Sequence, residues 1–192
     1  MATDTRQRLI EAAKSRFYRD GFRNVGIDAI LDDVGISKTA FYKHFASKDD
    51  LMVGVLDDVN GFLQQRFQRM VKDRGGPSAS SQLRAVLEVV KEIIEDQSFH
   101  GCIFVNVAME FPSPHDPAHQ AAVRHKKAIE EFVYELAERA GSTRPADLAR
   151  ELCMIMEGAY VTRAVTRDAA TIEIARRLAE SAFERHLPAR RP

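Results

Sequence analysis

Residues 34–48 form a short basic segment whose side chains could contact nucleic acid. The segment contains three lysines and a histidine and has no acidic residue. Its polar side chains are Ser37, Lys38, Thr39, Tyr42, Lys43, His44, Ser47 and Lys48. Lysine can donate to guanine O6 and N7 or to phosphate, the threonine methyl group can contact thymine, and a tyrosine hydroxyl can reach phosphate. The composition therefore favours a DNA-contacting surface.

Helical periodicity separates the segment into a buried and an exposed face. At 100° per residue, Phe41 and Phe45 fall close together and define the buried side. Thr39 and Lys43 lie opposite them, with Ala40 alongside. A single helix with such an outward face fits the major groove. The alternative is an ordinary solvated helix that carries an amphipathic tyrosine.

The predicted contacts differ in what they would do. The base-reading candidates are Lys38, Thr39, Ala40 and Lys43. Tyr42 and His44 flank the two edges of the exposed face, where Tyr42 suits a phosphate contact. Ser37 and Lys48 are expected at helix N-termini, where backbone amides and the helix dipole attract phosphate. Phosphate contacts would position the protein and base contacts would select the sequence.

The elements that must position these residues are all expected to be helices. Apolar residues recur at helical spacing almost throughout, and no useful alternating, strand-like run occurs. We expect Gly21 and Gly35 to end the first two helices, and Ser37 and Ser47 to cap the next two. The predicted helices cover about residues 5–19, 27–34, 37–45, 48–71, 82–96, 117–140, 148–159 and 171–186, with a break at 75–81 and a turn at 141–145.

Composition limits the class of protein. The chain has 192 residues and a formal charge of zero, and residues 1–50 hold nine basic and eight acidic side chains, so indiscriminate phosphate binding is not expected. No run approaches the roughly 20 apolar residues of a membrane span, and no signal peptide is seen. Only Cys102 and Cys153 are present, which favours a reduced cytoplasm. We expect a cytoplasmic protein with no membrane partner.

The first fifty residues resemble the TetR family, the tetracycline-repressor type of bacterial transcription regulators. The matching motifs are Gly21-Phe22, Ile30, Gly35-Ile36-Ser37, Phe41-Tyr42-Lys43-His44-Phe45 and Ser47-Lys48-Asp49 with Leu51. Gly26, Val34 and Ala40 depart from the usual pattern, where Thr or Ser, Ala, and Thr or Ser are common. The departures at Gly26 and Ala40 remove two hydroxyl groups that could contact DNA.

The resemblance implies an all-α protein with a three-helix helix-turn-helix head and a helical body. Residues 1–47 would form the DNA-binding domain, and residues 48–192 would form the ligand-binding and dimerisation domain. The implied partners are double-stranded operator DNA, an unidentified small-molecule effector and a second copy of the chain. The implied function is repression that a small, largely apolar effector relieves, with no cofactor and no metal.

The last two helices would build the homodimer. Small residues allow helix backbones to approach closely, and these helices contain Gly158, Ala159, Ala175, Ala179 and Ala182. The alternative is that the same residues pack helices within one chain.

Residues 101–111 resemble a segment that lines or neighbours the effector cavity in some family members. With other apolar side chains they could line a pocket for a small ligand. The ligand-binding candidates are Phe62, Phe99, Cys102, Phe104, Asn106, Met109, Glu110, Phe132, Met156 and Tyr160. The alternative is that they are core residues, and that Glu110 caps a helix or pairs locally.

Several further hypotheses remain open. Cys102 could sense oxidants or electrophiles through its thiolate, or be an inert buried thiol. His100, His115, His119 and His125 could bind a metal, although surface histidines are the simpler interpretation. No phosphate loop, HExxH or Gly-x-Ser-x-Gly motif indicates an enzyme. A constitutive helix-turn-helix module without a ligand, and an unrelated helical enzyme with a similar start, are the competing classes.

Overall fold

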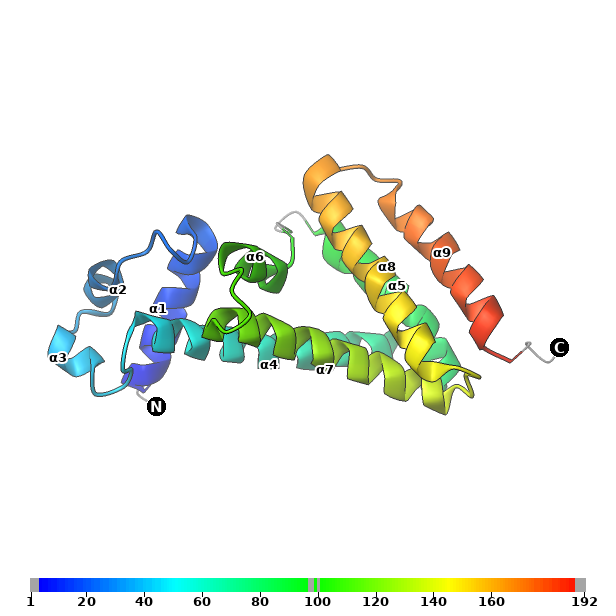
Figure 1. The fold of residues 1–192 in the computed structure, drawn as a ribbon, viewed down its shortest axis with the longest axis horizontal. Helices are drawn as coiled ribbons and strands as arrows, with labels where there is room; N and C mark the ends of the chain where they lie inside the picture. The colour runs from blue at the N-terminus through cyan, green and yellow to red at the C-terminus, as the bar shows by residue number, and fades with distance from the viewer. Residues whose placement is uncertain (1–3, 97–98, 100, 189–192) are drawn as a thin grey trace. The chain divides into compact units, whose positions relative to one another are not determined.

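A computed structural model describes residues 4–96, 99 and 101–188. Within this part of the chain there are nine α-helices and no strand, so the predicted all-α class is confirmed. The helices, labelled in Figure 1, are α1 (Thr5–Asp20), α2 (Ile27–Val34), α3 (Lys38–Phe41), α4 (Lys48–Gly75), α5 (Ala79–Glu95), α6 (Ile103–Glu110), α7 (Pro117–Arg139), α8 (Pro145–Thr166) and α9 (Thr171–His186).

The helix ends follow local chemistry at the predicted positions. Gly21 follows α1 with φ 83° and donates its N–H to the Phe17 carbonyl group. Gly35 follows α2 in the left-handed conformation, with φ 71°, which costs glycine less than any other residue. The Ser37 hydroxyl accepts the N–H of Ala40 at 3.2 Å, and the Ser47 hydroxyl accepts the N–H of Asp50 at 3.1 Å. The predicted caps of α3 and α4 are therefore confirmed.

Helix α3, the reading helix, carries most of the predicted base contacts and is shorter than predicted. Only Lys38–Phe41 are α-helical, and the chain then tightens into turns in which His44 donates to the Phe41 carbonyl group at 2.8 Å. This i to i+3 bond is the 3₁₀ pattern common at helix ends. Phe41 and Phe45 are both buried, and the Phe45 N–H still donates to the Phe41 carbonyl group at 3.1 Å in the α-helical i to i+4 pattern.

The described residues fall into two compact units. The first contains residues 4–62 and 103–125, and so includes α1–α3, α6 and the first parts of α4 and α7. Its α1 and α2 pack on each other and bury apolar side chains that point away from solvent. The main buried residues of this unit are Leu9, Ile10, Phe17, Phe22, Ile30, Phe41, Phe45, Leu51, Val55 and Leu56.

The second unit contains the described residues 63–96, 99, 101–102 and 126–188, and its helices α5, α8 and α9 pack together. Ala159, Ala175, Ala179 and Ala182 are buried in this unit's own core. The alternative interpretation of the small residues is therefore confirmed for these four, because they bring helices together within one chain. Gly158 is exposed and differs from them.

No helix among the described residues combines the length and apolarity that crossing a membrane requires.

Candidate nucleic-acid interface and effector-binding residues

Arginines of α1 build the frame beneath the reading helix. Arg8 donates to the Val34 carbonyl group at the end of α2 at 2.6 Å. Arg16 makes two hydrogen bonds with the Asp33 carboxylate, and these bonds lower the pKa of Asp33. The Arg6 guanidinium lies 5.0 Å from the centre of the Phe45 ring. These three cations hold α2 and the turn after α3 through intramolecular contacts.

The exposed side of α3 and the following turn matches the predicted wheel. Phe41 is fully buried and Tyr42 is 57% exposed, although the two rings touch edge to face. Thr39 and Lys43 are exposed, and Ala40 and His44 are half-buried. The Lys43 backbone N–H donates to the Ala40 carbonyl group at 3.3 Å, but its side chain makes no hydrogen bond or ion pair with the described residues. Its ammonium group is therefore available to an external acceptor.

Lys38 differs from Lys43 because it already has a partner. Its Nζ lies 2.8 Å from Oδ1 of Asp28, in the first turn of α2, and the hydrogen bond raises the pKa of Lys38. Sequence reasoning missed this pairing because the two residues belong to different helices. The ten-residue separation across a glycine turn was the available signal. Asp28 places a negative charge beside a predicted base reader.

We expect Asp28→Asn to strengthen binding to random duplex DNA. Removing the carboxylate releases Lys38 and removes repulsion of nearby phosphates, so the salt dependence should steepen by about 0.9 in log–log slope, the value for one additional phosphate contact. Fluorescence anisotropy at several salt concentrations measures both quantities. Asp32→Asn is the control, since it removes the same charge from an exposed position of the same helix. An equal effect of the two substitutions contradicts a specific role of the Asp28–Lys38 pair.

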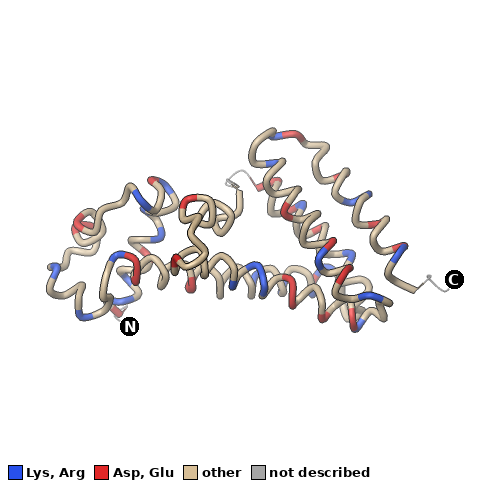
Figure 2. Tube along the Cα trace, viewed as in Figure 1, with Lys and Arg blue, Asp and Glu red and all other residues tan. Residues whose placement is uncertain are grey.

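Lys48 is the first residue of α4 and is half-buried. Its Nζ donates to the Arg23 carbonyl group at 3.2 Å, and the neighbouring Asp50 carboxylate accepts the N–H of Ala46 at 2.8 Å. One N–H of the ammonium group is thus engaged, and a lysine has three. Lys48 therefore retains the capacity to donate to a phosphate. Figure 2 shows basic and acidic residues interspersed along the trace rather than gathered into one basic block.

Five of the ten ligand candidates belong to the first unit. Phe62, Asn106 and Met109 are exposed. Phe104 is fully buried, and its ring stacks on the His125 ring with the two ring centres 4.0 Å apart. The Nδ1 atom of His125 lies 2.8 Å from Oδ1 of Asn60. Glu110 accepts the backbone N–H of Arg23 at 2.7 Å. The Glu110 carboxylate is thus engaged within the protein, but with a residue 87 positions away rather than locally.

The other five candidates belong to the second unit. The ring centres of Phe99 and Tyr160 lie 5.8 Å apart. The pKa of Tyr160 is raised, mainly by burial and to a smaller extent by the nearby Cys102. The Tyr160 hydroxyl makes no hydrogen bond with the described residues. Met156 is buried in the core. Phe132 packs edge to face against Phe67 of α4.

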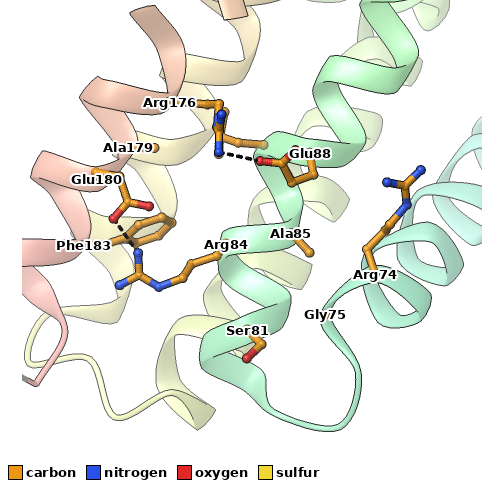
Figure 3. A pocket seen from close by; sticks show the side chains of 11 residues that line it. Arg74, Gly75, Ser81, Arg84, Ala85, Glu88, Arg176, Ala179, Glu180 and Phe183 are labelled. Carbon is orange, nitrogen blue, oxygen red and sulfur yellow. Dashed lines mark hydrogen bonds and ion pairs between the residues drawn. The ribbon is translucent and has the colours of Figure 1, made fainter. Parts of the chain in front are cut away.

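A surface hollow of about 350 Å³ lies in the second unit, and none of the ten candidates lines it. Figure 3 shows its walls on α5 and α9, where Arg84 pairs with Glu180 at 2.5 Å and Arg176 pairs with Glu88 at 3.1 Å. Arg74 also lines it and pairs with Glu92. Since its cations are already paired with carboxylates, the hollow suits neither an apolar ligand nor an anion.

The two cysteines differ in their surroundings. Burial raises the pKa of Cys153 to about 12, so its thiolate is scarce at neutral pH. Cys102 is half-buried directly before α6.

The described histidines of the metal hypothesis lie in different surroundings. His119 Nδ1 lies 2.8 Å from the Phe111 carbonyl oxygen, His125 stacks on Phe104, and His115 is exposed. His100 lies outside the described residues. The described part of the chain places no three His, Cys, Asp or Glu side chains where they could hold one metal ion.

Comparison with known families identifies both halves of the molecule. Residues 9–55 match the family described as bacterial regulatory proteins, tetR family. Residues 79–179, more than half of the chain, match the tetracyclin repressor-like C-terminal domain. The chain belongs to the TetR family. It is therefore a transcriptional regulator with a DNA-binding helix-turn-helix, and the family is not one of enzymes.

TetR relatives resemble the chain over most of its length. The HTH-type transcriptional regulator YjdC of Escherichia coli is 24% identical over 163 residues, covering 83% of each chain. The HTH-type transcriptional activator FasR of Mycolicibacterium smegmatis is 30% identical over 144 residues, covering 71% of this chain and 60% of FasR. The crystal structure of SCO4454, a TetR-family regulator from Streptomyces coelicolor, has 29% identity, a TM-score of 0.79 and 94% coverage of both chains.

Proposed function

We propose that this TetR-family chain is a cytoplasmic repressor that binds operator DNA as a homodimer and releases it when a small, largely apolar effector binds. Residues 1–47 would form the DNA-binding domain, and residues 48–192 would bind the effector and dimerise. The observation that carries the DNA-binding part is the unpaired, exposed Lys43 above the buried Phe41 and Phe45. Repression requires only that the bound protein occupies the DNA, although the relative FasR is named an activator.

In this proposal the candidate DNA contacts have two roles. Thr39, Ala40 and Lys43 read base edges, with Lys38 joining them when it leaves Asp28. Ser37, Tyr42, His44 and Lys48 contact phosphates around the groove. The 2.8 Å pair between Lys38 and Asp28 supports assigning the main readout to Lys43, because a paired lysine must first give up its carboxylate.

Exposed apolar side chains on α8 and α9 support the homodimer. Met154, Val161 and Val165 of α8 are 75%, 47% and 77% exposed, and Ile174 and Leu178 of α9 are 46% and 53% exposed. The α8 residues lie near one face, because their spacing follows the helical repeat. α8 and α9 also pack on each other. A second copy would cover these side chains, whereas single exposed apolar residues elsewhere need no partner.

The surroundings of Tyr160 support an effector site in the second unit. Its ring packs near Phe99 and Cys102, and its hydroxyl has no partner among the described residues. A half-buried hydroxyl without a hydrogen bond is unfavourable unless water or a ligand supplies one. An apolar molecule with one polar atom would satisfy it. By thermodynamic reciprocity, such an effector weakens DNA binding by the factor by which DNA weakens effector binding, typically about 5–150-fold.

We expect Tyr160→Phe to weaken effector binding and to leave DNA binding without effector unchanged. A panel of small apolar metabolites is first screened by thermal shift, since a compound that binds only the folded protein raises its Tm. Each hit is then titrated against the wild type and Tyr160→Phe, with and without DNA. Tyr134→Phe is the control, because that hydroxyl bonds Glu138 on the exposed side of α7. Equal effector affinity with and without DNA contradicts the mechanism.

A thiol sensor remains the second candidate function, with Cys102 as the reactive residue. Its half-buried position beside Tyr160 and directly before α6 supports this alternative. Loss of DNA binding on treatment with an electrophile in the wild type but not in Cys102→Ser would favour it over a noncovalent effector.

A further inference from the structure

The backbone of Arg23 is held at both of its polar groups by side chains from other helices. Its N–H donates to Oε1 of Glu110, the last residue of α6, at 2.7 Å. Its carbonyl oxygen accepts from Nζ of Lys48, the first residue of α4, at 3.2 Å. The Arg23 guanidinium also lies 5.0 Å from the centre of the Phe111 ring. Arg23 thus joins the end of α6 to the start of α4 within the first unit.

The segment that carries Arg23 is firmly anchored. Phe22 and Val25 on either side of it are buried, and the Phe22 ring stacks on Phe17 of α1 with ring centres 4.9 Å apart. The Asn24 side chain donates to the Asp20 carbonyl group at 3.0 Å. Glu110 therefore contacts a well-packed part of the helix-turn-helix head. A displacement of Glu110 would act on the Arg23 backbone and through it on the residues bound to Arg23.

Glu110 is poorly placed for the stability of its own helix. The C-terminal end of a helix carries partial negative charge, and a carboxylate there is repelled. An acidic residue at the end of α6 is better explained by its bond to Arg23, 87 residues away in the chain.

We propose that Glu110 is a positioning residue for DNA binding, because it holds the Arg23 backbone whose carbonyl group orients Lys48. Lysine is a flexible point charge, and a carbonyl group that accepts from its ammonium restricts the conformations it samples. A contact that is oriented before binding loses less entropy when DNA arrives. The inference rests on the proposed phosphate contact of Lys48.

The arrangement also gives α6 a direct influence on the head. α6 carries the predicted effector residues Asn106 and Met109 as well as Glu110. A displacement of the end of α6 would break the bond to Arg23 and release Lys48. This influence does not require α4 itself to move.

The test uses the full chain and the DNA duplex that the wild type selects from random oligonucleotides. We expect Glu110→Ala to weaken binding to this duplex about threefold to tenfold, the net worth of one hydrogen bond. The log–log salt slope should fall by up to about 0.9 as the Lys48 contact is lost. Glu110→Gln keeps an acceptor oxygen and should bind nearly as well as the wild type. Glu135→Ala, which removes the same charge from an exposed position of α7, is the matched control.

A double-mutant cycle with Lys48→Ala separates positioning from a general structural role. If Glu110 acts through Lys48, then Glu110→Ala causes no further loss in the Lys48→Ala background. Additive losses, or unchanged binding of Glu110→Ala alone, overturn the inference and leave the proposed phosphate contact intact. If Lys48→Ala binds as tightly as the wild type, the phosphate contact itself is wrong, and the inference fails with it.

Discussion

Leu178→Arg is expected to give a folded monomer that binds operator DNA about 100-fold or more weakly than the wild type. Leu178 is 53% exposed on α9, so an arginine at this position lies in solvent when the chain is a monomer. In the proposed dimer the same arginine would face the apolar side chains of the second copy. Two linked heads gain affinity from the effective concentration of the second head, commonly by a factor of about 10²–10⁴. Light scattering measures the mass, and anisotropy with a two-half-site duplex measures the affinity.

Ala182→Arg provides the contrast, because Ala182 lies four residues further along α9 and is fully buried in the second unit. An arginine there must place its charge in an apolar core, which proteins rarely tolerate. We expect this variant to lose its cooperative melting transition, whereas Leu178→Arg should melt near the wild-type temperature. An unchanged dimer of Leu178→Arg would show that this part of α9 is not the interface.

Lys43→Ala is expected to relax the base preference at one position in each half-site. The Lys43 side chain is exposed on the reading surface and has no partner among the described residues. A good contact to a base edge discriminates by about 1–3 kcal/mol, so a strongly preferred base should become nearly neutral. Selection of random duplexes with the wild type and the variant, followed by sequencing, measures the change.

Two control variants make the Lys43 result specific. Tyr42→Phe removes a proposed phosphate contact and should weaken binding to all sequences about equally. Lys127→Ala removes an exposed lysine from α7 and should change neither affinity nor preference. An unaltered preferred site for Lys43→Ala would rule out base reading by this residue.

Local signals in the sequence predicted most of the fold. Gly35 ends α2 because the left-handed conformation suits glycine, and Ser37 and Ser47 cap helices through bonds three residues away. Such features depend on neighbours in the chain, so periodicity and composition reveal them. The tightening of the chain after Phe41 was not predicted, because a helical wheel assumes one constant angle per residue.

Interactions between distant segments were harder to predict. The pair Asp28–Lys38 and the bond from Arg23 to Glu110 join different helices, and a single sequence does not show which exposed charges meet. Small residues were equally ambiguous. Ala175, Ala179 and Ala182 suit a close helix contact in either of two settings, and the single chain already uses them in its own core. The larger exposed residues beside them are the better markers of a dimer.

The intramolecular use of cations in the first unit has a consequence for the living cell. Arg8, Arg16 and Lys38 are bound to groups of the protein itself, so these three positive charges are not free to displace ions condensed on DNA. Binding to operator DNA should then depend less steeply on potassium concentration, because the exponent of the salt dependence scales with the number of phosphates neutralised. A cell that loses water under osmotic stress concentrates its salts, and a regulator with few phosphate contacts would lose less of its affinity for DNA under that stress than a strongly basic one.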